Sequence, residues 1–281
     1  MRTLDPKQIG EVVYQAIPKL ACELPDDILA GLQSAYEAED NPRGREILSL
    51  LTRNAQIAKD DQVPLCQDTG TVWVCLEAGP DVLIPGDIFS CVNSAVAKAY
   101  TEAKLRKSLL RDAFFDRTNT QDNTPAFCEI HLVDEPGVAR LHIMLKGGGS
   151  DNASRVVMLA PGAGKQGIID ELLDCLDHKA ANACPPLIIG IGIGATFDKV
   201  GGLAKRALTR PVNQVHPDPQ VAAFEAELLS IVNGTGIGPG ALGGKTTALG
   251  VKVNTAPCHI AALPLAINMG CSAMRRGTYE L

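Results

Sequence analysis

Two apolar stripes at helical spacing run through the first third of the chain. One comprises Ile9, Val12, Val13, Ala16, Ile17 and Leu20, and the other comprises Ile47, Leu48, Leu51, Ala55 and Ile57. Each stripe follows a capping side chain and a proline, Asp5-Pro6 and Asn41-Pro42, which is the usual start of a helix. The pattern predicts two helices that pack on a common core.

Segments rich in β-branched and apolar residues predict strands further along. They are 71–78, 127–133, 141–145, 187–191, 247–254 and 260–268, the last weakened by Pro264. The turn at 134–137 indicates a hairpin between the second and third strands. Helical patterns at 87–105, 166–177, 198–208 and 219–233 separate the others. We therefore expect a mixed α/β fold, a single domain over residues 1–281, with a helical N-terminal third packed on a mixed β-sheet core surrounded by helices.

Composition narrows the class of protein. The chain has 281 residues, 46% of them hydrophobic and 21% charged, which is typical of a globular protein. Its net charge is −6 and it has no basic run, which argues against a nucleic-acid surface. The N-terminus lacks an apolar signal core, and the longest apolar stretch, 185–195, is too short to span a bilayer. We expect a cytoplasmic protein.

Nine cysteines are the first candidates for chemistry. They occupy positions 22, 66, 75, 91, 128, 175, 184, 258 and 271. An odd number without a secretion signal predicts reduced thiols. Five of them fall within strand or helix patterns and are predicted to be small core residues: Cys22, Cys75, Cys91, Cys128 and Cys175.

Cys66, Cys184 and Cys271 instead lie among turn residues. Three thiolates suit a four-iron cluster in which one iron has no protein ligand and can bind substrate oxygens. Their spacing alone does not decide between such a cluster, a zinc site and three buried thiols, because no C-x-x-C pair is present.

Four glycine-rich segments have competing interpretations. Residues 190–195 fit the dinucleotide fingerprint, but no acidic residue follows in 205–217, which favours a tight turn between strand and helix. Residues 239–246 resemble a phosphate loop with proline in place of the first glycine, and 161–166 lacks the hydroxyl residue after lysine. Residues 146–152 hold three consecutive glycines whose N–H groups fit either a carboxylate cradle or a flexible turn.

Several short motifs, taken together and in order, resemble those of class I fumarate hydratases. The match covers nearly the whole chain, through residues 66–70, 105–108, 122–126, 146–152, 184–194, 210–211, 236–239, 243–247 and 259–261. The end of the chain, 268–278, is closer to L(+)-tartrate dehydratase alpha subunits. The resemblance implies an oxygen-sensitive hydro-lyase alpha subunit that acts on fumarate or malate, with L-tartrate as the alternative substrate and mesaconate as a further one.

The resemblance also implies roles for individual residues. Cys66, Cys184 and Cys271 would hold a [4Fe-4S] cluster with one open iron site. Asp68 and His259 would form a carboxylate–imidazole pair that helps the hydroxyl leave as water. The substrate dianion would be bound by Arg106, Gln67 and the backbone around Gly148.

A separate beta subunit would supply the base that removes the proton, in an α2β2 assembly. Two other classes stay open at this point. They are a non-catalytic subunit that only binds a partner, and a nucleotide-dependent oxidoreductase.

Overall fold

The computed structural model describes residues 2–281, and its contacts divide the chain into two compact units. Unit 1 comprises residues 2–25, 57–148 and 275–281, and unit 2 comprises residues 26–56 and 149–274. Each unit has its own sheet and core, so the expectation of a mixed α/β fold is confirmed. The single domain over 1–281 stays a prediction.

The helices predicted in the first third are present and capped as expected. The two predicted helices are α1 (Pro6–Cys22) and α3 (Pro42–Asp61), and a third helix that was not predicted, α2 (Asp26–Ala38), lies between them in the chain. The Asp5 carboxylate accepts the N–H of Lys7 at 2.9 Å, and the Asn41 side chain accepts the N–H of Arg43 at 2.9 Å. Both contacts satisfy donors that the first turn of a helix leaves unpaired.

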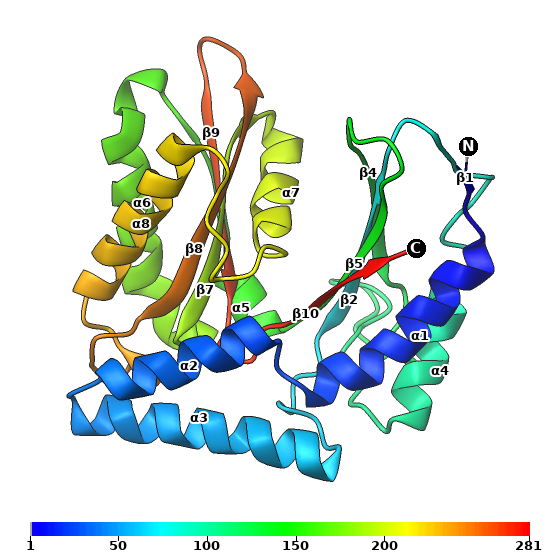
Figure 1. The fold of residues 1–281 in the computed structure, drawn as a ribbon, viewed down its shortest axis with the longest axis horizontal. Helices are drawn as coiled ribbons and strands as arrows, with labels where there is room; N and C mark the ends of the chain where they lie inside the picture. The colour runs from blue at the N-terminus through cyan, green and yellow to red at the C-terminus, as the bar shows by residue number, and fades with distance from the viewer. Residues whose placement is uncertain (1) are drawn as a thin grey trace. The chain divides into compact units, whose positions relative to one another are not determined.

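Unit 1 is built on a four-stranded mixed sheet with the order β10-β5-β2-β4. The strands are β2 (Thr71–Ala78), β4 (Phe127–Leu132), β5 (Ala139–Lys146) and β10 (Arg275–Glu280). Helices α1 and α4 (Val92–Glu102) cover one face of this sheet and enclose an apolar core with it (Figure 1). A short parallel pair, β1 (Arg2–Thr3) and β3 (Val82–Leu83), completes the unit.

The hairpin predicted from residues 127–133 and 141–145 is wrong. Strand β2 lies between the two segments, parallel to β4 and antiparallel to β5. The reason is burial, because β2 is apolar on both faces from Val72 to Leu76 and a strand of that kind belongs in the centre of a sheet. The largely exposed β4 takes the edge instead.

Unit 2 is also built on a four-stranded mixed sheet, with the order β6-β9-β7-β8. The strands are β6 (Arg155–Leu159), β7 (Leu187–Ala195), β8 (Ala248–Cys258) and β9 (Leu263–Gly270). Helix α7 (Phe197–Ala207) covers one face, while α6 (Gly164–Lys179) and α8 (Pro219–Gly234) cover the other (Figure 1). The short elements are α5 (Gly148–Asn152), η1 (Pro161–Ala163), η2 (Ala180–Ala183) and η3 (Pro239–Ala241).

Glycines in β7 explain how closely α7 packs on the sheet. A Cβ at Gly190 would lie 2.2 Å from the carbonyl oxygen of Ala204, and one at Gly192 would lie 2.5 Å from that of Val200. The glycines predicted to form a tight turn therefore serve mainly to let helix and strand approach. Within residues 2–281, no helix combines the length and apolarity needed to cross a membrane.

Candidate active site

The segment between α3 and β2 carries three of the predicted site residues. Cys66 and Asp68 are partly buried, and Gln67 is exposed. The two carboxylate oxygens of Asp68 accept the N–H of Gly70 at 3.0 Å and the N–H of Gly148 at 2.8 Å. The Cys66 thiol donates to the Gln67 side-chain oxygen at 3.3 Å. The orientation of the Asp68 carboxylate is thus fixed by two peptide groups from different parts of unit 1.

The same loop, residues 66–70, is anchored on its inner side. Gly70 has a φ of +81°, and a Cβ there would lie 2.8 Å from the carbonyl oxygen of Lys146, so glycine is required. The Tyr100 hydroxyl donates toward the carbonyl oxygens of Thr69 and Gly70, 3.0 and 3.1 Å away. Burial raises the pKa of Tyr100 to about 12, which keeps this hydroxyl protonated.

Two further motifs of the resemblance, residues 105–108 and 122–126, form hydrogen bonds with this loop in unit 1. The Thr69 hydroxyl donates to the carbonyl oxygen of Arg106 at 2.5 Å, while Arg106 itself is exposed. The buried Asn123 side chain donates to the carbonyl oxygen of Gly70 at 3.1 Å and accepts the N–H of Ser108 at 2.7 Å. Residues 66–70, 105–108 and 122–126 therefore form one connected structure around Asp68.

Sequence reasoning missed Arg275, which also contacts the 66–70 loop. Its side chain is buried, and Nη1 donates to the carbonyl oxygen of Asp68 at 2.6 Å. The residue belongs to the C-terminal segment noted for its likeness to tartrate dehydratases. Nothing in that segment distinguishes a buried arginine from a surface one.

Cys184 and Cys271 lie together in unit 2. Cys184 precedes β7 and Cys271 follows β9, which are adjacent antiparallel strands with Ile188 opposite Gly270. The carbonyl oxygen of Cys184 accepts the N–H of Ser272 at 3.1 Å, so the two loops are joined beside both thiols. Cys184 is exposed and Cys271 is partly buried.

His259 lies at the opposite end of this sheet, in the exposed turn between β8 and β9. Strand β9 has eight residues, which at about 3.3 Å each place His259 roughly 25 Å from Cys271. The imidazole Nδ1 accepts the N–H of Ala261 at 3.1 Å. In the neutral ring the proton is therefore on Nε2.

No metal-binding group of three His, Cys, Asp or Glu side chains forms within either unit over residues 2–281. Cys66 belongs to unit 1, and Cys184 and Cys271 belong to unit 2. None of the nine cysteines in the described chain forms a disulfide. All three predicted ligands are therefore thiols, the donor type that iron–sulfur clusters use.

The cysteines predicted to be core residues divide into two groups. Cys22, Cys75 and Cys175 are buried, as expected. Cys91 is only partly buried, and Cys128 is exposed, so the core assignment is wrong for these two. Cys128 lies on β4, an edge strand of the unit 1 sheet.

The loop predicted to resemble a phosphate site is held by a buried glutamate. One oxygen of Glu39 accepts the N–H of Lys245 at 2.8 Å, and the other accepts the N–H of Asn41 at 3.0 Å. The Lys245 ammonium pairs with Asp40 at 2.7 Å. This loop is a structural link between α2 and β8, which agrees with its failure to match the phosphate-binding motif.

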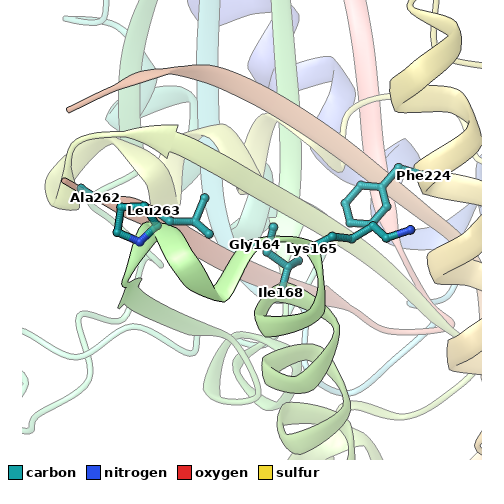
Figure 2. A pocket seen from close by; sticks show the side chains of 7 residues that line it. Gly164, Lys165, Ile168, Phe224, Ala262 and Leu263 are labelled. Carbon is teal, nitrogen blue, oxygen red and sulfur yellow. The ribbon is translucent and has the colours of Figure 1, made fainter. Parts of the chain in front are cut away.

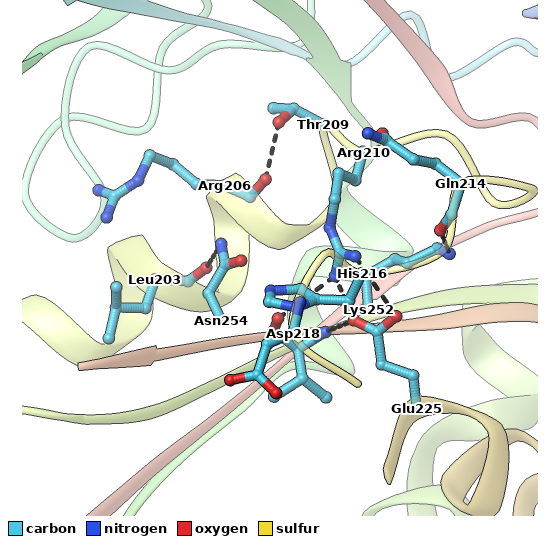
Figure 3. Close-up of polar contacts among 11 residues, drawn as sticks. Leu203, Arg206, Thr209, Arg210, Gln214, His216, Asp218, Glu225, Lys252 and Asn254 are labelled. Atoms are coloured by element: carbon cyan, nitrogen blue, oxygen red, sulfur yellow. Dashed lines mark hydrogen bonds and ion pairs between the residues drawn. The ribbon is translucent and has the colours of Figure 1, made fainter. Parts of the chain in front are cut away.

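The Arg210-Pro211 motif is structural as well. Figure 3 shows the Arg210 guanidinium donating to both oxygens of the Glu225 carboxylate, and Arg210 also donates to the carbonyl oxygen of Val253 at 3.2 Å. Glu225 accepts the N–H of Val253 at 2.6 Å. The nearby Lys252 ammonium donates to the carbonyl oxygen of Gln214 at 2.6 Å. The group ties α8 to β8.

A cavity of about 360 Å³ in unit 2 contains none of the predicted site residues (Figure 2). Its lining is mostly apolar and consists of Pro161, Gly164, Lys165, Ile168, Phe224, Ala262 and Leu263. The Lys165 ammonium is paired with Glu227 at 2.8 Å. Lys165 is therefore the one titratable residue in this lining, and its charge is paired.

The fold and the 66–70 loop define a mixed α/β protein that presents a carboxylate held by two peptide N–H groups, two residues from a thiol. Residues 10–280 match the model of the family described as fumarate hydratase (Fumerase). The chain belongs to this family, and it is a hydro-lyase subunit.

Curated relatives extend over nearly the whole chain. A Methanocaldococcus jannaschii protein that carries the provisional name L(+)-tartrate dehydratase subunit alpha is 38% identical over 277 residues, 96% of each chain. The L(+)-tartrate dehydratase subunit alpha of Escherichia coli strain UTI89 is 30% identical, over 98% of this chain and 91% of its own. That of strain K12 is 30% identical, over 96% of this chain and 90% of its own.

Proposed function

We propose that the chain is the alpha subunit of an iron–sulfur hydro-lyase that interconverts a 2-hydroxy dicarboxylate and its unsaturated product, with fumarate and malate as the first candidate pair. The observation that carries the proposal is the Asp68 carboxylate, held by two peptide N–H groups two residues from Cys66. Membership of the fumarate hydratase family supports it. L-tartrate is the second candidate because the relatives named above are tartrate dehydratase subunits.

Cys66, Cys184 and Cys271 are the proposed ligands of a [4Fe-4S] cluster. The paired loops that carry Cys184 and Cys271 support this, since two ligands of one cluster must lie close together. When bound, a cluster with one iron that lacks a protein ligand supplies a Lewis acid for the substrate hydroxyl and carboxylate.

Asp68 is the proposed acid for dehydration. The carbon–oxygen bond breaks while Asp68 gives its proton to the departing hydroxide, which leaves as water. The electron pair of the neighbouring carbon–hydrogen bond becomes the new double bond, and its proton passes to a base. Two of about four lone-pair positions on the Asp68 carboxylate are used by Gly70 and Gly148, which leaves positions for the transferred proton.

Arg106 and Gln67 are the proposed substrate contacts of this chain. Both side chains are exposed, and both residues are linked to Asp68 through the 66–70 loop. A guanidinium can bind a carboxylate through two parallel hydrogen bonds. For Gly148, contact with the substrate stays a prediction, because its N–H already donates to Asp68.

His259 is the proposed second member of the acid pair, and the length of β9 limits how it can act. About 25 Å separate it from Cys271 in the same unit. A His259 that reaches the cluster must therefore come from a second copy of the chain. Replacing His259 by Asn should lower kcat far more than cluster content, and unchanged turnover would remove this residue from catalysis.

The relatives are named as alpha subunits, so this chain has a partner subunit. We propose that a beta subunit supplies the base, that the assembly is α2β2 and that it is cytoplasmic. The isolated chain should then have no turnover.

Anaerobic co-expression with a beta subunit from the same organism tests the proposal. The complex should be brown and should turn over malate, fumarate, L-tartrate or mesaconate, and the Cys184→Ser variant should lose both colour and activity. Cys128→Ser is the matched control, since it removes an exposed thiol on β4. A colourless and inactive complex after anaerobic reconstitution would favour a non-catalytic partner-binding subunit.

A further inference from the structure

Arg275 is an arginine whose charge is buried but poorly compensated. It is the first residue of β10 and only 1% exposed. Nη1 donates to the carbonyl oxygen of Asp68 at 2.6 Å, and Nε has no hydrogen-bond partner among residues 2–281. Burying a guanidinium in this way is costly unless nearby negative charge offsets it.

The carboxylate of Asp68 itself is a negative group close to this guanidinium. A Cβ at Gly147 would lie 3.2 Å from the Asp68 Oδ2 atom and 3.7 Å from the Arg275 Nη2 atom. The carboxylate and the guanidinium therefore both lie beside Gly147, which has no side chain of its own. Arg275 holds the peptide of Asp68 and places a positive charge beside the loop that carries Cys66, Gln67 and Asp68.

A second residue holds this loop without a charge. The Tyr100 hydroxyl contacts the carbonyl oxygens of Thr69 and Gly70, and burial keeps it neutral. Tyr100 and Arg275 thus anchor consecutive peptides of one loop, the first by a neutral group and the second by a cation. A variant of each separates loop anchoring from charge.

We propose that Arg275 is a positioning residue for the hydro-lyase reaction, which fixes the Asp68 peptide and supplies the buried positive charge beside the 66–70 loop. This inference rests on the proposed function of Asp68 and Cys66. Arg275 does not contact the substrate in this proposal. Its loss acts through Asp68, which works in the transition state, so it should lower kcat and leave KM almost unchanged.

The test uses the anaerobic complex with its beta subunit and three variants at the loop. In Arg275→Met, kcat should fall about 10- to 100-fold, because a small displacement of a catalytic group has effects of that size. Arg275→Lys keeps the charge and should recover part of kcat. Tyr100→Phe removes an uncharged anchor and should lower kcat less.

A second readout separates the charge from a purely structural effect. The midpoint potential of the cluster, measured by redox titration, should become more negative in Arg275→Met and stay near the wild-type value in Arg275→Lys and Tyr100→Phe. Arg140→Met is the matched control. Arg140 lies on β5 of the same sheet and pairs with Glu77 and Glu135, both at 3.2 Å, away from the 66–70 loop. Its kcat and potential should not change.

All kinetic constants are to be measured at a temperature at which melting curves show each variant to be folded. An Arg275→Met complex with kcat and potential equal to wild type would overturn the inference. If Arg275→Met does not fold, the Arg275→Lys complex carries the test: a lowered kcat with unchanged KM and a wild-type potential supports the inference, and a wild-type kcat overturns it. A wild-type complex without cluster or turnover would instead overturn the proposed function.

Discussion

Two carboxylates, Asp68 in unit 1 and Glu39 in unit 2, organise glycine-rich loops by the same set of contacts. Each accepts one peptide N–H from two residues further along the chain, Gly70 for Asp68 and Asn41 for Glu39. Each also accepts one N–H from a distant glycine-rich segment, that of Gly148 for Asp68 and that of Lys245 for Glu39. In both cases the carboxylate therefore holds a glycine-rich segment that is far from it in the sequence.

The two sites differ in burial and in what surrounds the carboxylate. Glu39 is 2% exposed, and its two oxygens are enclosed by the loop that it holds. Asp68 is partly exposed, has a thiol two residues away and has a buried guanidinium against its own peptide. The same hydrogen-bond pattern serves stability where the carboxylate is sealed and can serve chemistry where part of it faces outward.

The largest difference between the two carboxylates is expected in kcat, for the variant Asp68→Asn. An amide cannot give up a proton as a carboxylic acid does, so kcat of the complex should fall about 10²- to 10⁴-fold. The amide oxygen still accepts one N–H, and thermal unfolding should change little. Steady-state assays and melting curves measure both.

Asp81→Asn is the control for this variant. Asp81 also accepts a glycine N–H in unit 1, that of Gly137 at 2.7 Å, and it lies outside the 66–70 loop. Its kcat should match that of the wild type. Equal turnover of Asp68→Asn and wild type would remove Asp68 from catalysis and erase the difference between the two sites.

The opposite result is expected for Glu39→Gln. The new amide group places an N–H against a peptide N–H, so one buried hydrogen bond is lost and a donor is left unpaired. The free energy of unfolding should fall by about 1–3 kcal/mol, as measured by urea denaturation of the chain. Turnover per folded molecule should not change.

Glu37→Gln, an exposed position on α2, is the control for the change in charge. It should leave the denaturation midpoint in place. A Glu39→Gln chain as stable as wild type would show that the buried contacts of Glu39 add nothing to the fold.

Local patterns predicted much of the fold because the responsible contacts are local. The caps at Asp5 and Asn41 act within three residues, and the predicted strand 71–78 has the bounds of β2. The failed hairpin shows the limit. The turn at 134–137 is a short-range signal, whereas the placement of β2 between β4 and β5 depends on burial of β2 on both faces.

Of the candidate site, the sequence predicted only the residues that lie in recognisable motifs. Cys66 stood out by its setting among turn residues and by resemblance, and Asp68 stood out by resemblance alone. Arg275 and Glu39 did not, because they act on residues 207 and 206 positions away and look like ordinary surface charges in the sequence. Only the structure shows that these charges are buried and what they hold.

The smallest effect is expected for Gly147→Ala, which probes the space between the Asp68 carboxylate and Arg275. The new methyl group would lie 3.2 Å from Asp68 Oδ2, a contact that a shift of a few tenths of an ångström relieves. Because Oδ2 is also held by Gly148, the shift moves the carboxylate, and kcat should fall about tenfold. The melting temperature should change little, since no buried group loses its partner. Gly162→Ala, where a Cβ meets nothing within 4 Å, is the matched control and should behave as wild type. A Gly147→Ala complex with full kcat would show that the reaction tolerates movement of Asp68, and the contrast with the sealed site of Glu39 would then lie in burial alone.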